Sequence, residues 1–136
     1  RRPRLAIRVG GTPHRRVFGR CAAVVSHAGS GTVASAVLAG KPQVLCPFIF
    51  DQFWWAEQMQ HLGVAPAAVS LRGEDPAEAE AALTQALRSA LRSPAHAEAA
   101  MELAVRARAE AETSVPKALA QIRAQLEHVM APPALP

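Results

Sequence analysis

The feature that most constrains this chain is a glycine-rich loop between an apolar run and a run of small residues. Residues 22–26 are Ala-Ala-Val-Val-Ser, a β-rich stretch typical of a strand buried on both faces of a parallel sheet. Residues 27–32 are His-Ala-Gly-Ser-Gly-Thr, and a small-residue helix is expected at 32–39, ended by Gly40. A strand, a glycine loop and a helix in this order indicate a βαβ unit, and therefore an α/β protein.

Other apolar runs on both sides of the loop predict an alternation of strands and helices. Short strands are expected at 5–9 and 43–46, and a minor edge strand at 64–69. Helical segments are expected at 14–20 and 52–62. The predicted fold is a Rossmann-like parallel sheet with flanking helices. Three or four strands are few for such a sheet, so the chain is interpreted as the C-terminal portion of one.

Beyond residue 74 the chain is expected to be helical. Helices are predicted at 75–92, 93–111 and 113–129, each with a proline close to its start. The Pro-rich end, 131–136, is expected to be a frayed tail. Residues 1–130 would then form one partial domain.

Composition narrows the classes of partner. Half of the residues are hydrophobic and 19% are charged, which provides for a packed core and argues against disorder. A net charge of +4 would suit an anionic partner. The arginines are scattered, however, without an aromatic platform or a lysine run. They are interpreted as solvated faces whose field attracts phosphate, and nucleic acid is not predicted as a partner.

Cysteine usage and hydropathy bear on the compartment. Cys21 and Cys46 lie in apolar surroundings without metal-ligand spacing, so buried free thiols are expected. No apolar stretch approaches the roughly 20 residues that span a bilayer. The expected location is cytoplasmic, with peripheral association with a membrane left open.

The loop at 27–32 has the composition of an anion site. The first N–H groups of a helix lack intrahelical partners, and the dipole contributes about 0.3–1 kcal/mol there, too little to hold a nucleotide alone. His27 adds a ring N–H. Ser30 and Thr32 add hydroxyls and amides. Gly29 and Gly31 let the backbone approach phosphate oxygens closely.

Three other glycine motifs fit this loop less well. A Walker A loop needs a lysine after its last glycine, and none follows Gly31. A nucleophile elbow needs glycines two residues from the serine, whereas those beside Ser30 are adjacent to it. A dinucleotide fingerprint fits Gly29, Gly31 and Ala34. Its acidic residue would be Asp51, which opens a helix instead of ending a strand. For the loop taken alone, a tight turn with an incidental histidine also remains open.

Four ordered segments resemble the donor-site signature of the UDP-glycosyltransferase superfamily. They are His-Ala-Gly-Ser-Gly-Thr at 27–32, Ala-Gly-Lys-Pro at 39–42, Pro-Phe-Ile-Phe-Asp-Gln at 47–52 and Leu-Gly-Val at 62–64. The lead-in at 13–23 and the Asp-Gln-Phe-Trp-Trp run are most similar to the sterol and bacterial natural-product branch. The resemblance covers about residues 4–70. It implies the GT-B fold, of which this chain would be the C-terminal, donor-binding half.

The resemblance also implies roles by position. The residues implied to bind the nucleotide diphosphate are His27, Gly29, Ser30, Gly31 and Thr32. The pair Asp51 and Gln52 is implied to hydrogen-bond the hydroxyls of the donor sugar. Asp51 also suits the N-cap position of the following helix. Trp54 and Trp55 face different sides of that helix, so one is expected in the core and the other near the sugar or a partner domain.

The nucleoside site departs from the plant-type pattern. Ser35 stands where plant-like members have a ribose-binding glutamate, so the choice between UDP and dTDP stays open. Val9 and Thr12 stand near the places of the base-binding Trp and Gln. Base contact would then rest on the backbone near Thr12 and Pro13.

The implied reaction is an inverting hexosyl transfer from a UDP- or dTDP-sugar to a lipid, sterol-like or natural-product acceptor. Charge builds on the leaving diphosphate, and fixed donors at a helix end stabilise it, so no metal or other cofactor is predicted. In this superfamily the catalytic base and acceptor pocket lie in an N-terminal domain. This chain is therefore expected to be inactive without that domain, in cis or as a partner subunit. The alternatives are a non-catalytic donor-binding subunit and, less favoured, a dinucleotide-binding fragment of an oxidoreductase.

Overall fold

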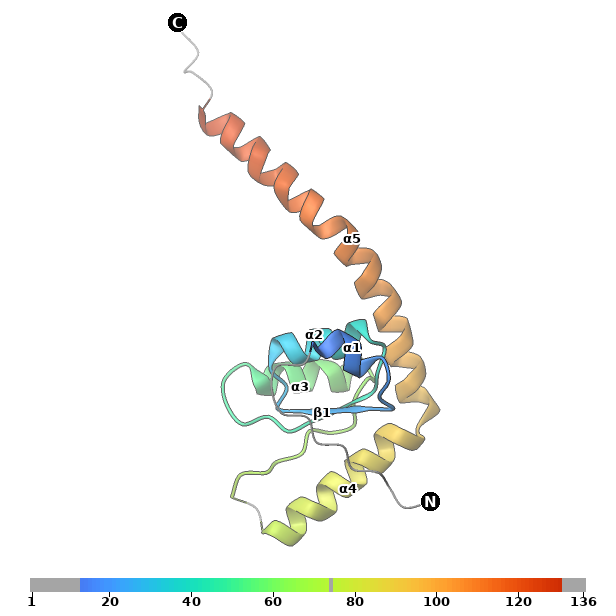
Figure 1. Ribbon diagram of the computed structural model, residues 1–136. Helices are drawn as coiled ribbons and strands as arrows, with labels where there is room; N and C mark the ends of the chain where they lie inside the picture. Colours follow the sequence, from blue (N-terminus) through green and yellow to red (C-terminus); the bar gives the residue numbers. More distant parts are fainter. Residues whose placement is uncertain (1–12, 74, 131–136) are drawn as a thin grey trace, which may run out of the picture.

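The computed structural model describes residues 13–73 and 75–130 (Figure 1), and the structural statements below refer to these residues. In chain order the elements are α1 (His14–Phe18), β1 (Val24–Ser26), α2 (Ser30–Leu38), β2 (Gln43–Leu45), α3 (Gln52–His61), α4 (Pro76–Arg92) and α5 (Pro94–Met130). The predicted strand at 5–9, the tail at 131–136 and Thr12 lie outside the described residues.

The two strands form a parallel sheet, with α2 as the connection between them (Figure 1). Val24 pairs with Gln43 and Ser26 with Leu45, which confirms the predicted βαβ unit and the Rossmann-like α/β fold. The prediction that the first strand is buried on both faces is wrong. Val25 is 49% exposed, because only the face that carries Val24 is covered within the described part of the chain.

The predicted edge strand at 64–69 is also wrong. The segment runs beside β2 and makes two backbone hydrogen bonds to it. The Gln43 amide donates to the Val64 carbonyl at 3.1 Å, and the Val69 amide donates to the Leu45 carbonyl at 2.9 Å. Pro66, between these two contacts, has no N–H to donate, and no strand forms there.

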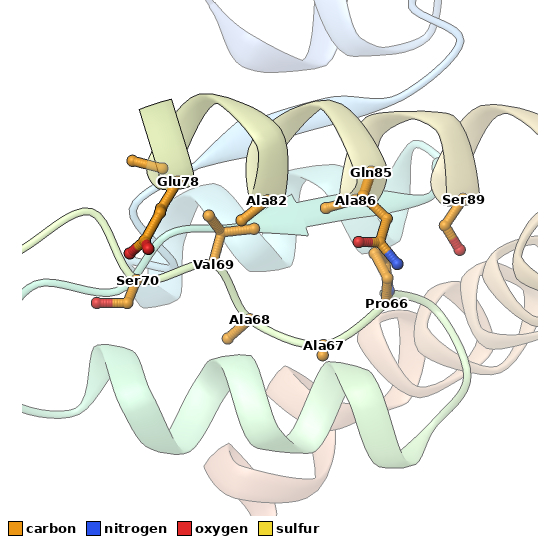
Figure 2. Close-up of a pocket in the computed structure, with 11 residues that line it drawn as sticks. Pro66, Ala67, Ala68, Val69, Ser70, Glu78, Ala82, Gln85, Ala86 and Ser89 are labelled. Atoms are coloured by element: carbon orange, nitrogen blue, oxygen red, sulfur yellow. The ribbon is translucent and has the colours of Figure 1, made fainter. Parts of the chain in front are cut away.

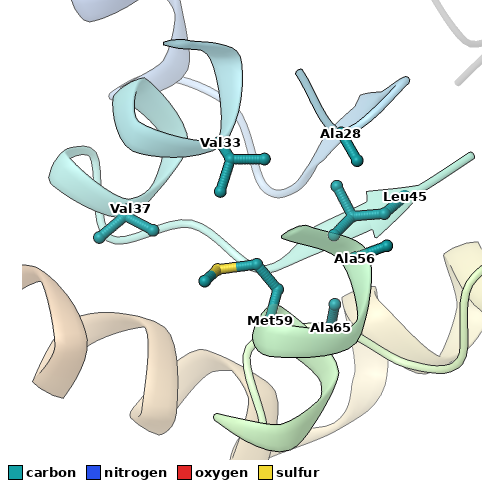
Figure 3. Packing of buried hydrophobic residues seen from close by; sticks show 7 residues of the cluster. All are labelled: Ala28, Val33, Val37, Leu45, Ala56, Met59 and Ala65. Carbon is teal, nitrogen blue, oxygen red and sulfur yellow. The ribbon is translucent and has the colours of Figure 1, made fainter. Parts of the chain in front are cut away.

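The core lies on both faces of β2, because successive residues of a strand point to opposite sides. Leu45 packs with α2, α3 and the loop after β1 in a cluster that Figure 3 shows: Ala28, Val33, Val37, Leu45, Ala56, Met59 and Ala65. Val44 packs on the other face with Cys46, Val69, Ala86 and Ala90. Both cysteines are free thiols, as predicted, but only Cys46 is buried and Cys21 is half-buried. Burial raises the pKa of the Cys46 thiol.

The last two predicted helices are one. α5 continues through Pro116, which contradicts the predicted break at residues 111–113. Thr113 and Ser114 do not cap a new helix. Their hydroxyls donate instead to the carbonyls of Glu110 and Ala111 within the same helix. Residues 111–127 are all exposed, so water can satisfy the backbone group that Pro116 leaves unpaired.

Only the first part of α5 packs on the rest of the molecule (Figure 1). Ala100 and Ala104 are buried there. Gly40 ends α2 with a φ of +64°, and a Cβ on it would lie 2.8 Å from the Met101 sulfur. Glycine at position 40 therefore serves both the left-handed backbone and the close approach of α5.

Candidate functional site

Two loops leave the sheet side by side at its carboxyl edge. Ser26 and Leu45 are paired at the ends of β1 and β2, and the Cys46 amide donates to the Ser26 carbonyl at 2.8 Å. The loop 27–29 leads into α2, and the loop 46–51 leads into α3. Ligands of open α/β sheets bind in the crevice outside this edge. The fold thus brings the predicted diphosphate and sugar residues to the same edge of the sheet.

The first loop is turned by Ala28. This residue has a φ of +63°, which is uncommon for a residue other than glycine, and its side chain is fully buried in the core. The Ala28 amide donates to the Ser26 hydroxyl at 3.3 Å. With Ala28 turned inward, the preceding side chain, His27, is exposed at the edge of the sheet. Strained backbone of this kind is frequent at ligand sites.

The His27 ring lies directly over Gly29. A Cβ at position 29 would be 2.5 Å from Nε2 of the imidazole and 3.2 Å from Cε1. The φ of Gly29 is −64°, which any residue adopts, so glycine is needed here for space and not for conformation. The ring therefore lies at the start of α2, and the diphosphate-binding role of His27 stays a prediction.

The N-terminus of α2 is open. Gly29 is its N-cap, and the Gly29 carbonyl accepts from the amides of Thr32 at 2.9 Å and Val33 at 3.0 Å. Within the described part of the chain, the amides of Ser30 and Gly31 have no acceptor. The first turn holds no acidic residue and no side-chain cap. The positive end of the helix is therefore available to an external anion.

The C-terminal end of α2 is capped by an arginine side chain. The Arg108 guanidinium donates to the Leu38 carbonyl from Nε at 3.1 Å and from Nη2 at 2.7 Å. A positive charge at a helix C-terminus is favourable for the dipole. Sequence reasoning missed this contact, since the two residues are 70 apart in the chain and no local pattern links them.

Of the predicted nucleoside-binding residues, the structure describes Pro13 and Ser35. Pro13 is the N-cap of the short helix α1, in which His14 stacks on Phe18 at 4.7 Å. The Ser35 hydroxyl donates to the Gly31 carbonyl at 2.8 Å, and Ser35 lines a hollow of about 340 Å³. Ser35 therefore retains its lone pairs for a ligand, and its ribose role stays a prediction.

Asp51 does not act as predicted for an N-cap. It stands at the N-cap position of α3 but makes no capping hydrogen bond. One carboxylate oxygen, Oδ2, accepts instead from Nε1 of Trp55 at 3.0 Å. Trp55 also packs on the core cluster, whereas Trp54 is 52% exposed, so the prediction of one inner and one outer tryptophan is confirmed for the inner one.

Gln52 holds the second loop in shape. Its Oε1 accepts from the amides of Phe48 at 2.8 Å and Ile49 at 3.1 Å. Arg72 donates to the Phe48 carbonyl at 3.0 Å. The Nε2 group of Gln52 and the Oδ1 atom of Asp51 have no partner within the described residues, so they are the atoms of the pair that are available to a ligand. No local sequence pattern points to Arg72, which is 24 residues from Phe48.

A groove that is lined mainly by small residues lies elsewhere. It has a volume of about 430 Å³ between the segment after α3 and α4, and Figure 2 shows alanines on both walls with Glu78 and Gln85. None of its lining residues belongs to the predicted site. Among the described residues no three His, Cys, Asp or Glu side chains gather as metal ligands. No described helix is long and apolar enough to span a bilayer.

Comparison with known proteins gives the chain its relatives. Residues 4–126 match the family model for the C-terminal domain of proteins similar to erythromycin biosynthesis protein CIII. A sterol 3-beta-glucosyltransferase of Arabidopsis thaliana is 41% identical over 59 residues, which are 43% of this chain and 10% of that protein. The O-mycaminosyltylonolide 6-deoxyallosyltransferase of Streptomyces fradiae is 44% identical over 66 residues, 48% of this chain and 16% of that protein. This chain thus spans a small part of either relative.

A solved structure agrees. The structure of the glycotransferase of kitacinnamycin matches with a TM-score of 0.60 and 27% identity, over 73% of this chain and 24% of that one.

Proposed function

Since the chain belongs to the family of C-terminal domains similar to that of erythromycin biosynthesis protein CIII, a family of GT-B glycosyltransferase domains, we propose that it binds the nucleotide sugar of an inverting hexosyl transfer. In this proposal the donor is a UDP- or dTDP-sugar. The acceptor is a sterol-like lipid or a natural product, as the names of the relatives indicate. The protein acts in the cytoplasm, with an acceptor-binding domain in cis or on a partner chain.

The open N-terminus of α2 beside the His27 ring is the observation that carries this proposal. The free amides of Ser30 and Gly31 lie beside the imidazole, and the first turn of α2 holds no acidic residue and no side-chain cap that would compete with a bound anion. A pyrophosphate needs several converging donors, because a helix end alone contributes about 0.3–1 kcal/mol. These groups, with the hydroxyls of Ser30 and Thr32, supply them.

The sugar lies next to Asp51 and Gln52 in this proposal. Trp55 and the loop amides each occupy one atom of the pair, so the remaining Oδ1 and Nε2 are an acceptor and a donor with fixed positions. One acceptor and one donor suit adjacent sugar hydroxyls, each of which can donate or accept. Because both side chains are held before the ligand arrives, little conformational entropy is lost on binding.

The chemistry proposed for the chain is stabilisation of the leaving group. As the bond between the anomeric carbon and the diphosphate oxygen breaks, negative charge grows on that oxygen. Preorganised N–H donors stabilise developing charge more than they stabilise the ground state. We propose that these donors perform this task without a metal or another cofactor, and that the catalytic base is supplied from outside the chain.

The test is UDP and dTDP binding by the protein in its native form, measured calorimetrically. His27→Ala is expected to weaken binding of the preferred nucleotide about tenfold, since one charge-assisted hydrogen bond contributes about 1.5–3 kcal/mol. His61→Ala is the matched control, because His61 is exposed at the far end of α3. Unchanged affinity in His27→Ala, or tight NAD binding without a response to either diphosphate, would refute the proposal.

A further inference from the structure

Five large apolar side chains are exposed together on the loop and helix that carry Asp51 and Gln52. They are Phe48, Ile49, Phe50, Phe53 and Trp54, and they are called the apolar patch below. Phe50 is 87% exposed, an extreme value for a phenylalanine. Contiguous exposed apolar residues of this kind commonly mark a binding surface.

The loop part of the patch is held rigidly. Phe50 has a φ of +51°, and the backbone on its N-terminal side is fixed by the Gln52 side chain and by Arg72. On its C-terminal side the Gln52 amide donates to the Ile49 carbonyl at 3.2 Å. A flexible loop could place its aromatic side chain against the core. In this loop, hydrogen bonds maintain a strained backbone conformation at Phe50, and its ring stays in solvent.

We infer that the apolar patch is this chain's contribution to the acceptor site, where it contacts the apolar body of an acceptor molecule that the proposed acceptor-binding domain holds from the other side. This inference rests on the proposed function, since it takes Asp51 and Gln52 as the sugar-binding pair. Phe50 and Phe53 directly flank that pair in the chain. In a displacement the acceptor oxygen has to come within about 3–3.5 Å of the anomeric carbon. Side chains next to the sugar are therefore next to the acceptor as well.

The charges around the patch favour a neutral occupant. Between residues 47 and 55 the only charged residue is Asp51. The Arg72 guanidinium, which reaches this loop, donates to the Phe48 carbonyl. Segments that dock on anionic membranes combine apolar side chains with free Lys or Arg, which this loop lacks. A neutral, carbon-rich alcohol fits the patch better than a lipid surface does.

The experiment uses the protein in its native form, loaded with UDP, and two alcohol probes, phenol and 4-hexylphenol. Calorimetry gives the dissociation constant of each. We expect 4-hexylphenol to bind at least about tenfold more tightly, because each methylene that is buried strengthens binding about fourfold. Phe50→Asn and Phe53→Gln are expected to reduce this preference by about threefold to tenfold. Asparagine tolerates the left-handed backbone, so Phe50→Asn removes the ring without adding strain.

Leu91→Asn is the matched control, since Leu91 is exposed to a similar extent as Phe53 but lies near the end of α4. It should leave the preference unchanged. No preference in the wild type, or an equal preference in the patch variants, would overturn the inference. The inference would also be overturned if the patch variants kept the wild-type preference for 4-hexylphenol but lost binding to phosphatidylglycerol vesicles or association with the acceptor domain. Failure of UDP itself to bind would refute the proposed function instead, which keeps the two failures distinct.

Discussion

Both loops at the carboxyl edge of the sheet contain a non-glycine residue with a positive φ, but the two residues face opposite ways. Ala28 turns its methyl group into the core, where it is fully buried. Phe50 turns its ring into solvent. The first loop is held from within by packing. The second is held along its backbone, where Gln52 Oε1 accepts from loop amides and Arg72 donates to a loop carbonyl. The same local strain is thus maintained by two different means.

The difference shows what each loop presents. Because Ala28 is fixed in the core, the loop at 27–29 displays a histidine and backbone amides, which are polar groups. Because the loop at 46–51 needs no core contact at its tip, it displays large apolar side chains. Two adjacent loops of one sheet edge can thus serve an anion and an apolar molecule.

The largest effect is expected from valine at the two strained positions. Ala28→Val adds a β-branched side chain to a fully packed, left-handed site and should lower the free energy of unfolding by about 3 kcal/mol or more. Phe50→Val places the same residue in the same backbone region without a packing cost, and about 1 kcal/mol is expected. Urea denaturation measures both. Equal losses would show that packing does not distinguish the loops.

The next effect concerns the ring over Gly29. Gly29→Ala places a methyl group where the His27 ring lies, so the ring has to move. We expect the dissociation constant for UDP to rise about tenfold. In a His27→Ala background the same change should have an effect below about twofold, because no ring remains to collide. A loss of similar size in both backgrounds would contradict this account of Gly29.

The smallest effect is expected at the loop 46–51, from a change that should leave the function of the loop 27–29 intact. Gln52→Leu leaves the Phe48 and Ile49 amides without their acceptor. Hydrogen exchange at these amides should accelerate about tenfold, which corresponds to the roughly 1–1.5 kcal/mol of one hydrogen bond. Affinity for a UDP-sugar should fall, whereas affinity for UDP stays within about twofold. Gln60→Leu, on the exposed side of α3, is the control. Slower or unchanged exchange would show that Gln52 does not hold the loop.

The sequence predicted those parts of the fold that depend on local signals. The helix starts at Asp75-Pro76 and Ser93-Pro94 and the helix ends at Gly40 and Gly63 are all confirmed. Each rests on a residue whose backbone preference acts within one turn. Pro116 shows the limit of such signals. In a solvent-exposed helix the lost hydrogen bond can be replaced by water, so the proline does not end α5.

For each loop, the residues of the candidate site could be predicted from the sequence, but the contacts that orient them could not. The glycine loop and the Asp-Gln pair were found from the sequence, and the structure brings them to one edge of the sheet. The interactions that orient them were not found. The contacts of Arg72 with Phe48 and of Arg108 with Leu38 join residues 24 and 70 positions apart, and only the tertiary fold creates them. The exposure of Phe50 was not predicted, because it depends on the left-handed backbone of the loop, which no local pattern indicates.

The contact between Arg108 and Leu38 bears on the order in which parts of the protein fold while it is being synthesised. The segment from β1 to β2 leaves the ribosome some 60 residues before Arg108 does. Its strands and helix are close in sequence, so they can pair early, while the cap of α2 awaits α5. A nascent chain would therefore hold the proposed phosphate-binding turn before the C-terminal end of α2 receives its cation. Assembly of the proposed anion site and completion of the fold are then separate events in time.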